Sequence, residues 1–174
     1  VYKAAKKTLG EEEEFKKTEE QLSKVDEDKL KNKKLYYYFM QLGRDVYTGE
    51  KIDLDILLSK NSDYDIDHII PQALVKDDSF TNTVLVNQSA NRHKSDSYPI
   101  PQGIVTPEGR KWIKTLNKIS IGNRSLMPKE KMDRILRPEN RPLDPSQIEG
   151  FVNRQLTSTN QSTAAVADVL KESD

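Results

Sequence analysis

Cysteine is absent from this chain of 174 residues, which excludes disulfides and thiolate metal sites and favours a reducing compartment. Long apolar runs are missing as well. No stretch approaches the roughly 20 residues that cross a bilayer, and no hydrophobic targeting segment opens the chain. Hydrophobic residues make up only 34% of the sequence, while charged residues reach 32%. The absence of long apolar runs predicts a protein without a membrane partner. The low hydrophobic content predicts a modest core in the middle of the chain.

The net charge of zero conceals a segregation of sign. Residues 35–80 hold nine acidic against four basic side chains, whereas residues 81–140 hold eleven basic against five acidic ones. An acidic region followed by a basic one indicates a cation site beside a polyanion site. A solvated surface of mixed charge is the alternative interpretation, and charge alone favours it.

Composition divides the chain into three parts. Residues 1–34 alternate lysine and glutamate blocks with few apolar positions, which predicts a lead-in helix or linker. Residues 35–140 carry the apolar periodicity of a folded domain. Residues 141–174 begin with a proline-rich stretch and continue as two weakly amphipathic helices, so we expect an outgoing linker there.

Helical periodicity within the domain is broken by glycine and proline. The aromatic segment 35–42 has helical spacing, and Gly43 is expected to end that helix. Further helices are predicted at 112–119, ended by Gly122, and at 128–138, where prolines open and close the segment. These helices are expected to form the scaffold of the domain.

The middle of the chain alternates between apolar and polar residues with the period of a strand. Residues 63–70 (DYDIDHII) form the first predicted strand, which Pro71 stops, and residues 84–86 (VLV) form the second. Ser89 is a suitable N-cap for the helix that follows. Strand, loop, strand and helix make a ββα hairpin over about 63–98, so the predicted fold class is α+β, with this hairpin on a mostly helical scaffold.

The hairpin carries a set of side chains suited to phosphodiester hydrolysis, which needs an activated water and stabilised oxygens on phosphorus. His68 is the candidate general base, because histidine accepts a proton near neutral pH. Asp67 and the amide oxygen of Asn91 are hard ligands suited to Mg²⁺, with Mn²⁺ as a substitute. Asn82, between the strands, is expected to orient the imidazole or its backbone surroundings. The order of these residues predicts a one-metal nuclease.

Three cations bracket the predicted site: Lys76, Arg92 and Lys94. We expect them to bind phosphates of a nucleic acid. The geometry of the site leaves two possibilities open, because neighbours such as Asp67 and His68 point to opposite faces of a flat strand. Either the strand ends or twists so that both face one site, or the metal and the water approach from different sides.

These residues resemble the HNH nuclease fold, also called the ββα-metal class, with His68, Asn82 and Asn91 as its letters. The longer segments LYYYFMQLGRDVY, DYDIDHIIPQ, KDD and NRHKSD resemble the HNH domain of type II CRISPR effectors, the RNA-guided endonucleases of the Cas-nine family. The later GFVNRQL resembles the segment that leads towards their RuvC-like nuclease domain. Ser89 stands where some relatives carry an acid, and His93 where others have a small residue.

The resemblance implies a Mg²⁺-dependent endonuclease domain that cleaves the DNA strand paired to a guide RNA. Its expected partners are that RNA–DNA heteroduplex and the remainder of the effector, with its RuvC-like and recognition lobes. Phage-encoded inhibitor proteins are further candidate partners, and the bacterial cytoplasm is the expected location. Two alternatives are a free-standing HNH endonuclease and a non-catalytic module that binds nucleic acid or an inhibitor.

Overall fold

The computed structural model describes residues 33–151, so residues 1–32 of the predicted lead-in (1–34) and residues 152–174 of the predicted outgoing linker (141–174) lie outside the described residues. The described elements are, in chain order, α4 (Lys33–Met40), α5 (Leu54–Leu57), β1 (Tyr64–His68), the 3-10 turn η1 (Phe80–Asn82), β2 (Thr83–Asn87), α6 (Gln88–Lys94), α7 (Pro107–Asn117), β3 (Ser120–Ile121), β4 (Arg124–Ser125) and α8 (Lys129–Leu136). The predicted α+β class is confirmed, whereas the division of the chain into three parts stays a prediction.

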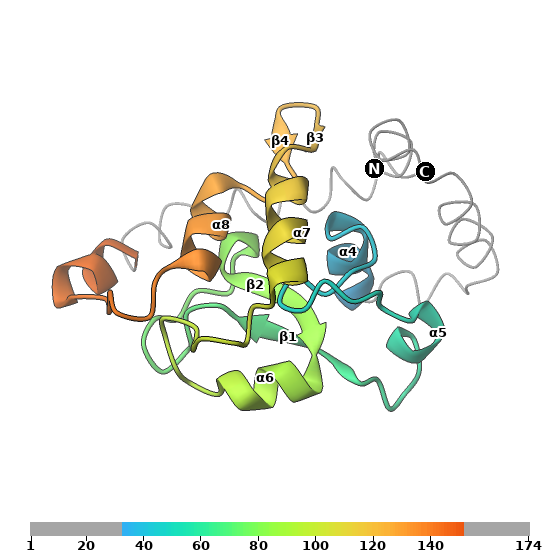
Figure 1. The fold of residues 1–174 in the computed structure, drawn as a ribbon, viewed down its shortest axis with the longest axis horizontal. Helices are drawn as coiled ribbons and strands as arrows, with labels where there is room; N and C mark the ends of the chain where they lie inside the picture. Colours follow the sequence, from blue (N-terminus) through green and yellow to red (C-terminus); the bar gives the residue numbers. More distant parts are fainter. Residues whose placement is uncertain (1–32, 152–174) are drawn as a thin grey trace.

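The predicted ββα hairpin is present at the middle of the chain. Strand β1 pairs antiparallel with β2, and α6 follows β2 directly and packs against both strands. In Figure 1, α6 lies below the strand pair, and α7 and α8 lie above it. None of the helices between residues 33 and 151 is long and apolar enough to cross a membrane.

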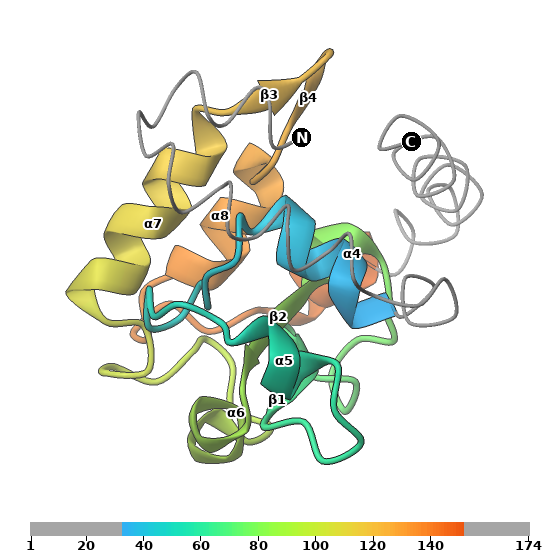
Figure 2. The ribbon, with the colours of Figure 1, turned by 90° about the vertical axis from the view of Figure 1, so that its right-hand side faces the viewer.

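Strand β2 is buried on both of its faces. Side chains alternate between the two faces of a strand, and the alternation of β2 divides the core in two. Val84 and Val86 join a cluster that includes Ile113 and Leu116 of α7. Leu85 joins a second cluster, which α4 and α5 supply with the buried residues Leu35, Tyr37, Tyr38, Leu54 and Leu57. Figure 2 shows α4 and α5 together near the strand pair. The hairpin is therefore held from both sides.

The outer edge of β2 is covered by side chains rather than by a third strand. The buried Gln41 amide accepts a hydrogen bond from Leu85 N at 2.8 Å and donates one to Leu85 O at 2.9 Å. Asp45 Oδ2 accepts from Asn87 N at 2.8 Å. Buried backbone groups need partners, so these two side chains allow a two-stranded sheet to lie inside the domain.

Helix α7 begins in close contact with the backbone of Tyr47. Thr106 caps the helix by accepting from Gly109 N at 3.0 Å, and Thr106 N donates to Tyr47 O at 2.8 Å. A Cβ at Gly109 would lie 2.0 Å from Tyr47 O. Only glycine permits this approach, which fixes Tyr47 at the centre of the domain.

Two predicted boundaries were wrong. Asn87, not Ser89, caps α6, because its side chain accepts a hydrogen bond from Ser89 N at 2.7 Å. Gly122 does not end a helix. It lies in the turn between β3 and β4 with a positive φ of 59°, where glycine is favoured. Helix α7 has already ended at Asn117.

Candidate active site

Asp67 lies at the end of β1 with its side chain turned into the domain. Its Oδ2 accepts a hydrogen bond from Tyr47 Oη at 2.7 Å and lies 3.2 Å from Lys94 Nζ. Burial raises the pKa of the Asp67 carboxyl, while Lys94 and Tyr47 act in the opposite direction. Burial also raises the pKa of Tyr47 well above its usual value, so Tyr47 keeps its proton and remains the donor.

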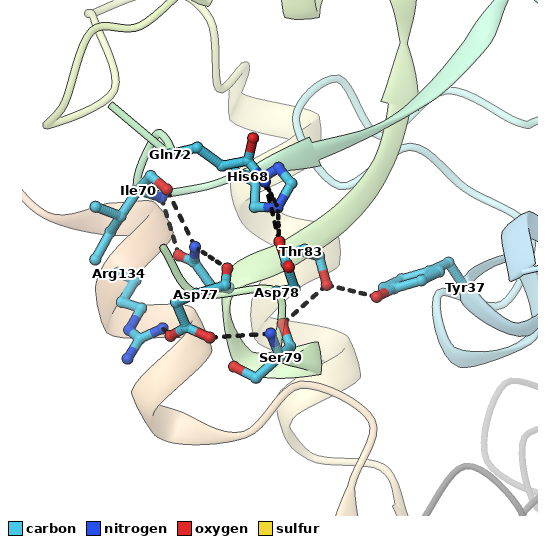
Figure 3. Close-up of polar contacts among 10 residues, drawn as sticks. Tyr37, His68, Ile70, Gln72, Asp77, Asp78, Ser79, Thr83 and Arg134 are labelled. Carbon is cyan, nitrogen blue, oxygen red and sulfur yellow. Dashed lines mark hydrogen bonds and ion pairs between the residues drawn. The ribbon is translucent and has the colours of Figure 1, made fainter. Parts of the chain in front are cut away.

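His68 points to the other face of the same strand. The strand register pairs Asp67 with Val84 and His68 with Thr83, and directly opposed residues share a face. His68 Nε2 lies 2.6 Å from Asp78 Oδ1, and the Gln72 amide nitrogen lies 3.3 Å from the same ring nitrogen. Figure 3 shows His68 between Gln72 and Asp78. The imidazole is about one quarter exposed, so it is accessible from solvent.

Asn82 is fully buried and contacts the backbone beyond His68 rather than the imidazole. Its Oδ1 accepts from Ile70 N at 2.9 Å, and its Nδ2 donates to Ile70 O at 3.1 Å and to Asp77 O at 2.9 Å. The Asn82 side chain therefore joins the two ends of the loop that follows β1. Of the two expectations for Asn82, this geometry fits the orientation of the backbone surroundings.

The loop that carries Asp78 is anchored at the neighbouring residues. Asp77 Oδ2 forms a buried ion pair with Arg134 of α8 at 3.0 Å, and Asp77 Oδ1 accepts from Ser79 N at 2.9 Å. Both interactions are visible in Figure 3. Asp78 thus has an exposed side chain on a backbone whose flanking residues are fixed.

Helix α6 brings Lys94 to the end of β1. Lys94 is buried, and its Nζ donates to His68 O at 2.9 Å in addition to its contact with Asp67. Asn91 precedes Lys94 by three positions, so the two side chains lie on one face of the helix. His93 points elsewhere, because its Nδ1 lies 2.7 Å from Ser89 O on the same helix.

The three predicted phosphate-binding cations occupy different environments. Lys76 and Arg92 are exposed, and their phosphate contacts stay a prediction. Lys94 is buried against Asp67 and the carbonyl of His68. Lys94 thus holds the Asp67 carboxylate and the His68 carbonyl in place, a role that its charge and its position in the sequence did not indicate.

The donor set at Asp67 suits a divalent cation. Both contacts of the carboxylate fall on Oδ2, and Oδ1 has no hydrogen-bond or ion-pair partner among residues 33–151. In that part of the chain, no group of three or more His, Asp or Glu side chains could hold a metal. Asp67 and Asn91 stay the predicted side-chain ligands, because a carboxylate oxygen and an amide oxygen suit Mg²⁺.

Sequence reasoning missed the partners that fix the two central residues. Tyr47, which donates to Asp67, lies in the mostly polar segment 44–51, where nothing in the sequence marks it as a partner of the site. Asp78 and Gln72, which contact His68, lie in the segment between the strands, where they belong to the resemblance but have no role assigned from the sequence. A signal for Asp78 existed: an acidic residue in a short loop next to a candidate histidine base.

Residues 45–100 match the HNH endonuclease family. Together with the ββα hairpin and the Asp67–His68 strand end, this match defines the domain as a nuclease domain of the HNH class. The chain is 40% identical over 148 residues to the CRISPR-associated endonuclease Cas9 of Streptococcus mutans and 38% identical over 148 residues to that of Listeria innocua. Each alignment covers 85% of this chain and 10% of the relative.

The crystal structure of Streptococcus thermophilus Cas9 in complex with AGGA PAM has the same fold. It superposes with a TM-score of 0.53 at 22% identity, covering 80% of this chain and 13% of that chain. The family match over residues 45–100 and the identities of 40% and 38% to two Cas9 proteins show that the chain belongs to the HNH endonucleases and matches the HNH domain of Cas9. It spans about a tenth of the length of the curated relatives it matches.

Proposed function

We propose that this chain is the nuclease domain of a guide-RNA-directed Cas9-type endonuclease and hydrolyses the DNA strand paired to the guide. The observation that carries the proposal is the strand end of β1. It presents a partly exposed imidazole held by a carboxylate next to a buried aspartate with one free oxygen. The similarity to the Cas9 of Streptococcus mutans supports the same function.

In the proposed reaction, His68 takes a proton from the attacking water. Asp67 and Asn91 would hold Mg²⁺, which when bound would supply Lewis-acid stabilisation of charge on the phosphate. Tyr47 and Lys94 fix the Asp67 carboxylate in one orientation, so that Oδ1 remains available. Asn82 keeps the backbone after His68 in place. The products are a 5′-phosphate and a 3′-hydroxyl.

The proposal extends to partners and location. Lys76 and Arg92, both exposed, are proposed to contact phosphates of the heteroduplex. The remaining partners are the RuvC-like and recognition lobes of the same effector, and phage-encoded inhibitor proteins are candidates for the same exposed site. The bacterial cytoplasm is the proposed location.

The test uses the full-length effector loaded with guide RNA and a duplex labelled on each strand. His68→Ala should lower the single-turnover cleavage rate of the guide-paired strand by about 10²- to 10⁴-fold. His93→Ala removes the only other histidine of this chain and should retain the parent rate. Cleavage of the opposite strand by the RuvC-like domain reports that each variant assembles on DNA. Unchanged cleavage of the guide-paired strand by His68→Ala would reject the proposal.

The metal ligands are tested by Mn²⁺ titration of the 174-residue chain. Asp67→Ala and Asn91→Ala should each weaken binding, because each removes one of two side-chain ligands. Asp65→Ala removes another carboxylate from β1, one that contacts Gln88 instead, and should bind as the parent does. Parent-like titrations for both ligand variants would show that the ligands were assigned incorrectly.

A further inference from the structure

Two side chains lie within 3.5 Å of the imidazole of His68, Asp78 and Gln72, and both lie at Nε2. Asp78 Oδ1 is 2.6 Å from Nε2, and the Gln72 amide donates to the same Asp78 oxygen at 3.1 Å. No described residue forms a hydrogen bond with Nδ1 of His68 in the part of the chain from 33 to 151. The two ring nitrogens therefore have different surroundings.

The donor and acceptor roles at this contact follow from the chemistry of the groups. Hydrogen bonds from His68 and Gln72 lower the pKa of the Asp78 carboxyl, so at neutral pH it is a carboxylate with no proton to give. A contact of 2.6 Å between a carboxylate oxygen and a ring nitrogen then requires the hydrogen to be on Nε2. In the neutral imidazole, Nδ1 is left with the free lone pair.

We propose that Asp78 is the positioning residue of His68: it holds the Nε2–H tautomer and turns Nδ1 towards the attacking water. This inference rests on the proposed nuclease function. Asp78 touches neither water nor phosphate in the proposed reaction and acts only through the ring it orients. Gln72 assists by donating to the same carboxylate oxygen, which keeps that oxygen aimed at the imidazole.

An exposed carboxylate orients a ring effectively only if its backbone is fixed. The backbone of Asp78 is fixed on both sides, because Asp77 is held by Arg134 and by the Asn82 amide, and Ser79 N donates to Asp77. The first two contacts connect α8 and η1 to the loop, and the third lies within it. Through the same framework, Asn82 would act on His68 without touching it.

The tautomer is tested directly by NMR on the chain labelled with ¹⁵N-histidine. The chain contains two histidines, and His93→Gln assigns the two sets of ring signals. His68 should show a protonated Nε2, protected from exchange, and an unprotonated Nδ1. His93 serves as an internal contrast with the opposite tautomer, because its Nδ1 donates to the Ser89 carbonyl. An unprotonated Nε2 at His68 would overturn the proposal.

The role of Asp78 is tested with Asp78→Ala and Asp78→Asn in the guide-loaded effector. Asp78→Ala should remove the protection of the His68 Nε2–H signal and lower kcat by about 10- to 100-fold, with KM nearly unchanged, because only the orientation of the base is lost. Asp78→Asn keeps an acceptor oxygen and should recover part of both losses. Asp55→Ala removes another exposed carboxylate, on α5, and should match the parent.

The outcomes separate this inference from the proposed function. If His68→Ala is inactive while Asp78→Ala keeps the parent kcat, the positioning role is rejected and the nuclease function stands. If His68→Ala retains full cleavage of the guide-paired strand, the nuclease assignment fails, whatever the ring spectra show. If the His68 Nε2–H signal is unchanged in Asp78→Ala, the hydrogen bond between His68 and Asp78 is rejected.

Discussion

Replacement of Asn82 by alanine tests how much the side chain of Asn82, the asparagine of the HNH motif, contributes to the stability of the domain. The side chain is fully buried, and its amide makes three hydrogen bonds to the backbone, one from Ile70 N and one to each of the carbonyls of Ile70 and Asp77. Asn82→Ala would leave all three groups without these partners in a region from which water is excluded.

The expected loss of stability follows from those three bonds. A buried hydrogen bond contributes about 0.5–1.5 kcal/mol net, so Asn82→Ala should lower the free energy of unfolding by about 3 kcal/mol. Asn82→Asp keeps the acceptor for Ile70 N but places a second acceptor oxygen against two carbonyl oxygens. We therefore expect Asn82→Asp to lose at least as much stability at neutral pH.

The assay is urea unfolding of the 174-residue chain, monitored by the fluorescence of its single tryptophan, Trp112. Asn91→Ala is the matched control, because Asn91 is only half-buried on α6, and it should stay within about 0.5 kcal/mol of the parent. In the cleavage assay, Asn82→Ala should also lower kcat, because the loop that carries Asp78 loses the hydrogen bonds that hold its two ends together. An Asn82→Ala chain as stable as Asn91→Ala would refute this account of the residue.

Two further substitutions test the framework around the site. Lys131 is fully buried with no hydrogen-bond partner among the described residues, and its Nζ lies 3.6 Å from the Phe80 ring centroid. Lys131→Met should therefore raise the free energy of unfolding by about 1–3 kcal/mol at pH 7. Because burial lowers the pKa of Lys131 well below 10.5, the unfolded parent binds this proton at higher pH than the folded parent. Parent stability should then rise from the folded pKa towards 10.5, a rise absent in Lys131→Met urea titrations. A less stable Lys131→Met chain would mean that the cation–π contact outweighs the burial penalty. Gly109→Ala should cost about 3 kcal/mol in the same assay, because its Cβ would collide with Tyr47 O, whereas Glu108→Ala should cost little.

The hairpin was predictable because its local pattern and its tertiary position agree. Residues 63–70 alternate in polarity, and β1 occupies Tyr64–His68 within that range. The helix boundary after β2 was not predictable, since both Asn87 and Ser89 are good N-caps. The pairing of Asn87 with Tyr64 decides between them, because β2 continues to Asn87 and the helix begins immediately afterwards.

The candidate site was predictable in its chemistry but not in its support. Asp67 and His68 stand out because an acid and a histidine end a strand. Their partners come from positions that are distant in sequence or uninformative in type, such as Tyr47, which is 20 residues from Asp67. Lys94 shows most clearly that side-chain contacts in the site could not be predicted from the sequence. Its charge predicted a phosphate contact, but a buried position against Asp67 depends on how α6 packs on β1, and that is a tertiary property.

The opposite directions of Asp67 and His68 place the two halves of the proposed chemistry on different sides of one strand end. Asp67 is held from the side of Tyr47 and α6, and His68 is held from the side of the loop with Asp78. Lys94 spans the division, because it contacts the Asp67 carboxylate and the His68 carbonyl together. A phosphate that met both a metal at Asp67 and a water at His68 would have to lie across the tip of β1. Strand β1 ends at His68, so of the two arrangements that the sequence left open, the proposed reaction requires the one in which the phosphate lies across the strand end.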